Sequence, residues 1–134
     1  MRQIRDVAEW VLDASAILAF VRKEPGRETV APLLSESAVS ANNLAEVASR
    51  LLDRGLSVDD VRALIDRLGL KVHSVDEAMA FDIGELRPVT RAKGLSLGDR
   101  SCLALARKLG LPAVTADRAW SQLAIDGLDV RLIR

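Results

Sequence analysis

Short apolar runs alternate with amphipathic segments along the chain, and this alternation limits the possible folds more than any other feature. The runs are three or four residues long, as in buried strands, and the segments between them carry apolar residues at helical spacing. We therefore predict an α/β fold with a five-stranded parallel sheet, helices on both faces and right-handed crossovers. The predicted strands are residues 10–12, 38–40, 72–75, 113–115 and 130–133.

Local start and stop signals place the helices between these strands. Asn42, Ser57 and Asp76 are predicted N-caps, because their side chains can accept a hydrogen bond from a first-turn amide. Pro88 is predicted to interrupt or end the helix that Asp76 opens. The predicted helices span about residues 14–22, 27–34, 43–54, 58–68, 77–87 and 98–109.

The length and the cysteine content narrow the class of protein. The chain has 134 residues, which suits one ordinary domain, so we expect a single domain over residues 1–134. The single cysteine, Cys102, excludes an internal disulfide, and its apolar neighbours indicate a buried thiol. A reducing, cytoplasmic location fits this cysteine usage. No stretch approaches the roughly 20 apolar residues of a membrane span, so no membrane partner is expected.

Carboxylates lie at or near the carboxyl ends of the predicted strands, where open parallel sheets bind their ligands. Asp13 follows the first strand, Asp117 follows the fourth, and Asp99 lies in the first turn of a helix. Each of the three has an alternative role as a helix cap or first-turn charge. Glu46 lies nearly opposite the apolar stripe of its helix, as a solvated residue would. Taken singly, the four acids leave both roles open.

A cluster of these carboxylates would require a cation. Like charges raise one another's pKa, so several carboxylates brought together cannot all remain ionised without a counter-charge. An oxygen-only set, with the one histidine elsewhere, suits Mg²⁺ or Mn²⁺ and disfavours zinc or copper. Hard metals held by carboxylates at a sheet end are typical of phosphoryl-transfer sites.

The four acids lie in segments 11–16 (VLDASA), 43–47 (NLAEV), 95–100 (LSLGDR) and 114–120 (VTADRAW). These segments resemble, in order, the four acidic motifs of PIN-domain ribonucleases, and the similarity is greatest to the VapC toxins of bacterial toxin–antitoxin pairs. The resemblance covers essentially the whole chain apart from the first few residues. No acidic position departs from the pattern.

The resemblance implies a fold, a site and an activity. The implied fold is a PIN-like three-layer α/β/α sandwich, and the implied catalytic residues and ligands of Mg²⁺ or Mn²⁺ are Asp13, Glu46, Asp99 and Asp117. Ser15 and Thr115 would be supporting hydroxyls. The implied protein is the endoribonuclease toxin of a type II toxin–antitoxin system, which hydrolyses RNA phosphodiester bonds by metal-activated water. Its implied partners are an RNA substrate, with tRNA as one candidate, a VapB-type antitoxin and a second copy of itself.

The charge distribution indicates where RNA would bind. Nineteen basic and nineteen acidic residues balance overall, but residues 87–118 hold seven basic and two acidic ones. A neutral protein must recruit a polyanion through such a local excess. The candidate phosphate contacts are Arg87, Arg91, Lys93, Arg100 and Arg118.

Two other classes of protein remain as alternatives. A phospho-acceptor receiver domain has a similar length and fold class, but it requires an acidic acceptor after the third strand, where this chain has His73 and Ser74. A catalytically silent RNA- or protein-binding module on the PIN fold would keep the same architecture without cleavage. Metal-dependent RNA cleavage discriminates the nuclease from this module.

Overall fold

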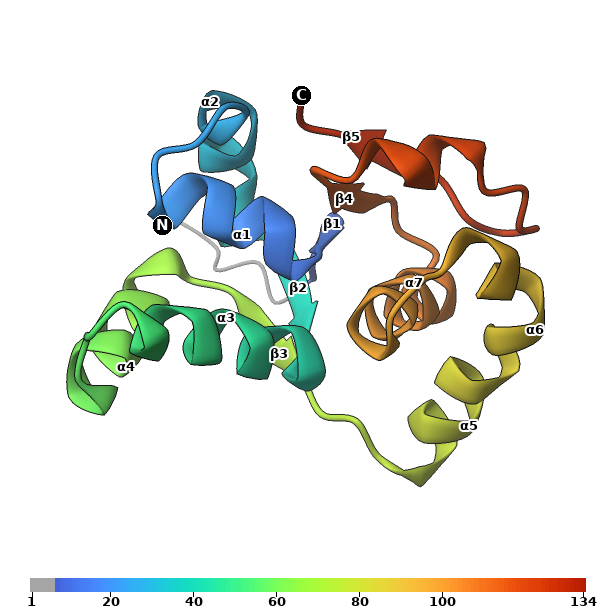
Figure 1. Ribbon diagram of the computed structural model, residues 1–134, viewed down its shortest axis with the longest axis horizontal. Coiled ribbons are helices and arrows are strands. Elements are labelled where there is room, and N and C mark those ends of the chain that lie inside the picture. The colour runs from blue at the N-terminus through green and yellow to red at the C-terminus, as the bar shows by residue number, and fades with distance from the viewer. Residues whose placement is uncertain (1–6) are drawn as a thin grey trace.

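The computed structural model describes residues 7–134 and shows a five-stranded, all-parallel sheet between two layers of helices (Figure 1). The strand order is β3-β2-β1-β4-β5. The strands are β1 (Trp10–Leu12), β2 (Ser37–Ser40), β3 (Lys71–His73), β4 (Ala113–Thr115) and β5 (Val130–Leu132). The predicted three-layer α/β/α sandwich is therefore confirmed.

The helices divide between the two faces of the sheet (Figure 1). One face is covered by α1 (Ala14–Val21), α2 (Arg27–Val30), α3 (Ala41–Asp53), α4 (Val58–Leu68) and the 3-10 helix η1 (Ala31–Glu36). The other face is covered by α5 (Glu77–Glu85), α6 (Arg87–Thr90), α7 (Leu97–Leu109) and the 3-10 helices η2 (Arg91–Lys93) and η3 (Arg118–Gln122).

The two hydrophobic cores follow from the alternation of side chains along the strands. Leu12 packs into the core on the α1 side, whereas its neighbour Val11 packs into the core on the α7 side, and both are fully buried. Val114 and Ala113 on β4 divide in the same way. A strand buried on both faces needs apolar residues at every position, which is why these strands appear in the sequence as continuous short runs.

Two local predictions were wrong. Asn42 does not cap α3: Ser40, the last residue of β2, accepts the hydrogen bond from the Asn43 amide, because the strand runs directly into the helix. The predicted continuous helix over residues 27–34 is instead the short α2 followed by η1, which has a proline in its first turn. Proline has no amide hydrogen, so it fits the start of a helix but not its interior.

The strand order reverses at β1, whose neighbours are β2 on one side and β4 on the other. Such a reversal leaves a crevice outside the carboxyl ends of the two central strands. The helix that follows β1 and the loop that follows β4 both begin at this crevice. Among the described residues, no helix is long and apolar enough to cross a membrane.

Candidate active site

Asp13 lies at the centre of the carboxyl edge, directly after β1. Its side chain is 4% exposed and caps α1 by accepting a hydrogen bond from the Ala16 amide at 2.8 Å. Ser15 Oγ lies 2.7 and 2.9 Å from the two carboxylate oxygens, and Thr115 Oγ1 also donates to this carboxylate. The side chain of Asp13 therefore caps a helix and also lies at the position predicted for a site carboxylate.

The two hydroxyl groups connect Asp13 to the segment that carries Asp117. Thr115 Oγ1 accepts a hydrogen bond from the Asp117 amide at 3.0 Å, and Ser15 Oγ accepts one from the Ala116 amide at 2.9 Å. Asp117 is exposed and caps η3 through a bond from the Ala119 amide to Oδ1. Ser15 and Thr115 therefore hold the chain after β4 against the carboxylate after β1.

Asp99 lies in the first turn of α7, near the carboxyl edge of the sheet. A complete capping box fixes this turn: Ser96 Oγ accepts from the Asp99 amide, and Asp99 Oδ2 accepts from the Ser96 amide at 2.9 Å. Asp99 is close enough to Asp13 for its charge to raise the pKa of the Asp13 carboxyl. The buried Cys102, one turn further along α7, has its pKa raised by burial and by these two aspartates, so it stays a neutral thiol.

Glu46 is exposed, as its position opposite the apolar stripe predicted, yet its carboxylate turns toward α7. Its Oε1 atom lies 2.7 Å from the point where a Cβ on Gly98 would lie. Gly98 directly precedes Asp99, so the Glu46 carboxylate lies over the first turn that carries the Asp99 side chain. The fourth acid is therefore at the same edge of the sheet as the other three.

Asn43 is a residue whose role the sequence analysis missed. It is 1% exposed and donates from Nδ2 to the Gly98 carbonyl at 2.9 Å, which ties the first turn of α3 to that of α7. The available signal was an amide side chain on the helix face that also carries buried Val47. A buried amide needs partners, so its presence there implied a specific hydrogen-bonding contact.

Burial makes Asp13 an unusual acid. Loss of solvent raises the pKa of its carboxyl from 3.8 to about 6, although the bonds from Thr115, Ala16 and Ser15 lower it in part, and the charge of Asp99 raises it further. Within residues 7–134, none of the four acids has a basic side chain in an ion pair with it. The site thus carries negative charge that no protein cation neutralises.

The donor atoms fit a hard divalent ion, because they are carboxylate oxygens that repel one another and lack a basic partner. As the side chains stand, no three His, Cys, Asp or Glu groups in the described part of the chain are close enough together to hold a metal. Asp99 and Asp117 each turn one oxygen to a capping amide.

The five candidate phosphate contacts divide into two groups. Arg87, Arg91, Lys93 and Arg118 are exposed, and Lys93 Nζ donates to Gln122 Oε1, which places η2 beside η3. Arg100 is half-buried and donates to the Ile83 carbonyl on α5 at 3.2 Å. Arg100 therefore contacts a neighbouring helix, whereas the other four are exposed to solvent.

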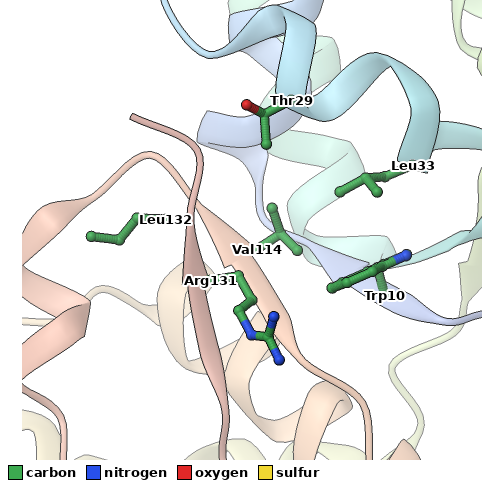
Figure 2. Close-up of a pocket in the computed structure, with 6 residues that line it drawn as sticks. All are labelled: Trp10, Thr29, Leu33, Val114, Arg131 and Leu132. Carbon is green, nitrogen blue, oxygen red and sulfur yellow. The ribbon is translucent and has the colours of Figure 1, made fainter.

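A pocket of about 260 Å³ lies away from these acids (Figure 2). It is bounded by Trp10, where β1 begins, by Arg131 on β5 and by the helical segment that carries Thr29 and Leu33. The Arg131 guanidinium lies 5.9 Å from the centre of the Trp10 ring. The carboxylates lie instead after the carboxyl ends of the strands, so this pocket is not part of the candidate active site.

These features define an α/β/α sandwich with an acidic site where its strand order reverses. The model of the PIN domain family matches residues 10–126 of the chain. The chain therefore belongs to the PIN-domain family, as the four acidic motifs predicted. No curated protein matches its sequence closely enough to count as a relative.

Solved structures share the fold at low sequence identity. A chain of a DNA-bound VapBC complex from Salmonella typhimurium is 20% identical with a TM-score of 0.69, over 96% of this chain and 100% of that one. VapC20 from Mycobacterium tuberculosis, described as a toxin that cleaves the sarcin–ricin loop, is 20% identical with a TM-score of 0.69, over 90% and 98%. PAE2754 from Pyrobaculum aerophilum is 22% identical with a TM-score of 0.61, over 92% and 89%.

Proposed function

We propose that the protein is a Mg²⁺- or Mn²⁺-dependent endoribonuclease and the toxin of a type II toxin–antitoxin pair. The observation that carries the proposal is the position of four acids, from four separate segments, at or near the carboxyl edge of the sheet. Asp13 and Asp117 follow adjacent strands β1 and β4, and Glu46 and Asp99 lie on the facing helices α3 and α7. Membership of the PIN-domain family supports the same assignment.

Asp13, Asp99 and Asp117 are the proposed metal ligands. The chemistry that such an ion supplies when bound is activation of water and stabilisation of negative charge on a leaving oxygen. Asp13 would be the fixed ligand, because Ser15, Thr115 and the Ala16 amide hold its carboxylate in place. Asp99 and Asp117 would contribute the oxygens that their capping bonds leave free.

Glu46 has a different proposed role from the three aspartates. Its carboxylate lies on the solvent side of the α7 first turn, beside Gly98. From there, Glu46 can accept the proton of the water that attacks the phosphorus atom, or act as a further ligand. Hydrolysis then breaks the bond from phosphorus to the leaving oxygen, which takes up a proton from solvent water.

RNA is the proposed substrate, and the exposed residues Arg87, Arg91, Lys93 and Arg118 are the proposed phosphate contacts. They belong to the segment 87–118, which has an excess of basic residues and also contains Asp99 and Asp117. Hairpins such as those of tRNA, or the sarcin–ricin loop that VapC20 is described as cleaving, are suitable first substrates. A VapB-type antitoxin, a second copy of the chain and a cytoplasmic location complete the proposal.

The test is cleavage of RNA by protein purified free of any antitoxin. A mixed panel of tRNA and the sarcin–ricin hairpin should be cut with Mg²⁺ or Mn²⁺ and left intact with EDTA. Cleavage that persists in EDTA would exclude the metal mechanism. Binding of RNA without cleavage under all metal conditions would favour the silent binding module.

A further inference from the structure

We propose that Gly98 is a positioning residue, which sets the place of the Glu46 carboxylate beside Asp99 by offering a surface without a side chain. The inference concerns the same site as the proposed function and rests on it for its catalytic consequence. Its structural basis is the close approach of Glu46 Oε1, 2.7 Å from the position of a Cβ at residue 98. Real Cβ atoms essentially never approach an oxygen so closely, so no other residue type fits unless Glu46 moves.

The backbone does not require glycine at this position. Gly98 lies within the first turn of α7 in ordinary helical conformation, where alanine is the better helix former. The reason for a glycine here is therefore the contact with the Glu46 side chain, which comes from another helix. Gly84 on α5 offers the contrast, because nothing lies within 4 Å of its Cβ position.

A set of hydrogen bonds holds α3 and α7 at the separation that this contact needs. Asn43 Nδ2 donates to the carbonyl of Gly98 itself, and Asn43 Oδ1 accepts from Ser40 Oγ at 2.7 Å. Asn42 Nδ2 donates to Ser101 Oγ at 3.0 Å, one turn further along α7. Glu46 follows Asn43 by three residues, so both side chains project from the same side of α3 toward this turn.

Glu46 itself has no other anchor. Within residues 7–134 its carboxylate takes part in no hydrogen bond or ion pair, and the residue is exposed. The carboxylate therefore occupies space that is open only because residue 98 has no side chain. A methyl group there would move the carboxylate away at little energetic cost to the fold, because it is the far end of a flexible side chain.

The decisive variant is Gly98→Ala, with Gly84→Ala as the matched control. Both changes add the same methyl group to an exposed or half-buried helical glycine, so both should leave the melting temperature unchanged or raised. Gly98→Ala should lower kcat for RNA cleavage roughly 100-fold, as expected when a reacting group is misplaced by about 1 Å, whereas Gly84→Ala should cleave as the wild type does. Cleavage by Gly98→Ala at the wild-type rate would overturn the proposal.

A second readout does not depend on cleavage. In the metal-free protein, Gly98→Ala should raise the melting temperature more when Glu46 is also replaced by alanine, because the added methyl group then displaces nothing. Calorimetry with Mn²⁺ alone should show altered binding for Gly98→Ala but no further change on adding it to Glu46→Ala. Equal effects of Gly98→Ala in both backgrounds would overturn the contact. A wild type that fails to cleave RNA would instead contradict the proposed function. The difference in melting temperature between the two Glu46 backgrounds would still test the contact at Gly98.

Discussion

The four acids form two pairs that are held by different means. The strand pair, Asp13 and Asp117, follows β1 and β4, and the hydroxyl groups of Ser15 and Thr115 bond to both segments. The helix pair, Glu46 and Asp99, lies in the first two turns of α3 and α7. Asn43 ties these helices together through the Gly98 carbonyl, and the Glu46 carboxylate lies against Gly98.

The difference shows that strand pairing within the sheet and packing between helices contribute unequally to the site. The strand pair is built into adjacent strands of the sheet, so the parallel pairing of β1 with β4 already fixes most of its geometry. The helix pair requires two helices that pack on opposite faces of the sheet to meet beyond its edge. We therefore expect substitutions in the strand pair to reduce cleavage more than substitutions in the helix pair. We also expect the helix pair to be easier to displace.

The largest expected effect is on RNA cleavage, when one acid of each pair is substituted in turn. Asp13→Asn should abolish cleavage, because the buried oxygen ligand is lost, while asparagine still caps α1. Glu46→Gln should leave measurable cleavage, reduced roughly 100- to 10,000-fold if Glu46 acts as a base. Single-turnover assays at saturating RNA measure both rates. Greater residual activity in Asp13→Asn than in Glu46→Gln would reverse the assignment of roles.

The next effect concerns stability and pH in the metal-free protein. Asp13 has a pKa of about 6 in the fold against 3.8 ordinarily, so the native state binds more protons than the unfolded chain between these values. The stabilising contribution of Asp13 to the free energy of unfolding should thus be fully present below about pH 4 and be lost, by up to about 3 kcal/mol, as pH rises through about 6.

Urea unfolding at a series of pH values measures this slope, and Asp13→Asn should remove it. The variant should also be at least as stable as the wild type at pH 7, since it has no buried charge to desolvate. Glu46→Gln is the control from the helix pair and should keep the slope. A marked loss of stability in Asp13→Asn at pH 7 would indicate that capping outweighs the strain of the buried charge.

A smaller effect is expected for the basic residues that flank the helix pair. Neutralising Arg91 and Lys93 together should weaken RNA binding roughly tenfold and flatten its salt dependence, because two phosphate contacts are lost. The rate of cleavage at saturating RNA should stay nearly unchanged. Arg62 and Arg67 are the matched control, since both are exposed on α4, on the opposite face of the sheet. Equal weakening by the control pair would place RNA elsewhere.

The smallest expected effect concerns self-association on the α5–α7 side. Phe81, Val89 and Leu97 are 68%, 60% and 59% exposed there, and a homodimer would bury some of this apolar surface. Sedimentation at tens of micromolar should show a dimer that Phe81→Ser weakens. Val58→Ser on α4, where Val58 is 54% exposed, is the control. A wild type that sediments as an ideal monomer would contradict the dimer.

The sequence by itself determined the layers and the edge at which the site lies. Five short apolar runs separated by helical stripes are compatible with few folds other than a covered parallel sheet, because both faces of each central strand must be buried. Asp13 and Asp117 could be placed at that edge from their position directly after strands. The family membership could be predicted from four short motifs in order.

Only the tertiary structure decided what lies around the helix pair. Helical periodicity assigns Glu46 to the solvent face of α3, and this is correct for α3 taken alone. Its contact at Gly98 depends on a second helix more than 50 positions away, held by the amide of Asn43. The contact of Arg100 also depends on another helix, because its side chain donates a hydrogen bond to a carbonyl on α5. Periodicity reports which side of an element is buried, whereas the packing of distant elements decides what each side chain contacts.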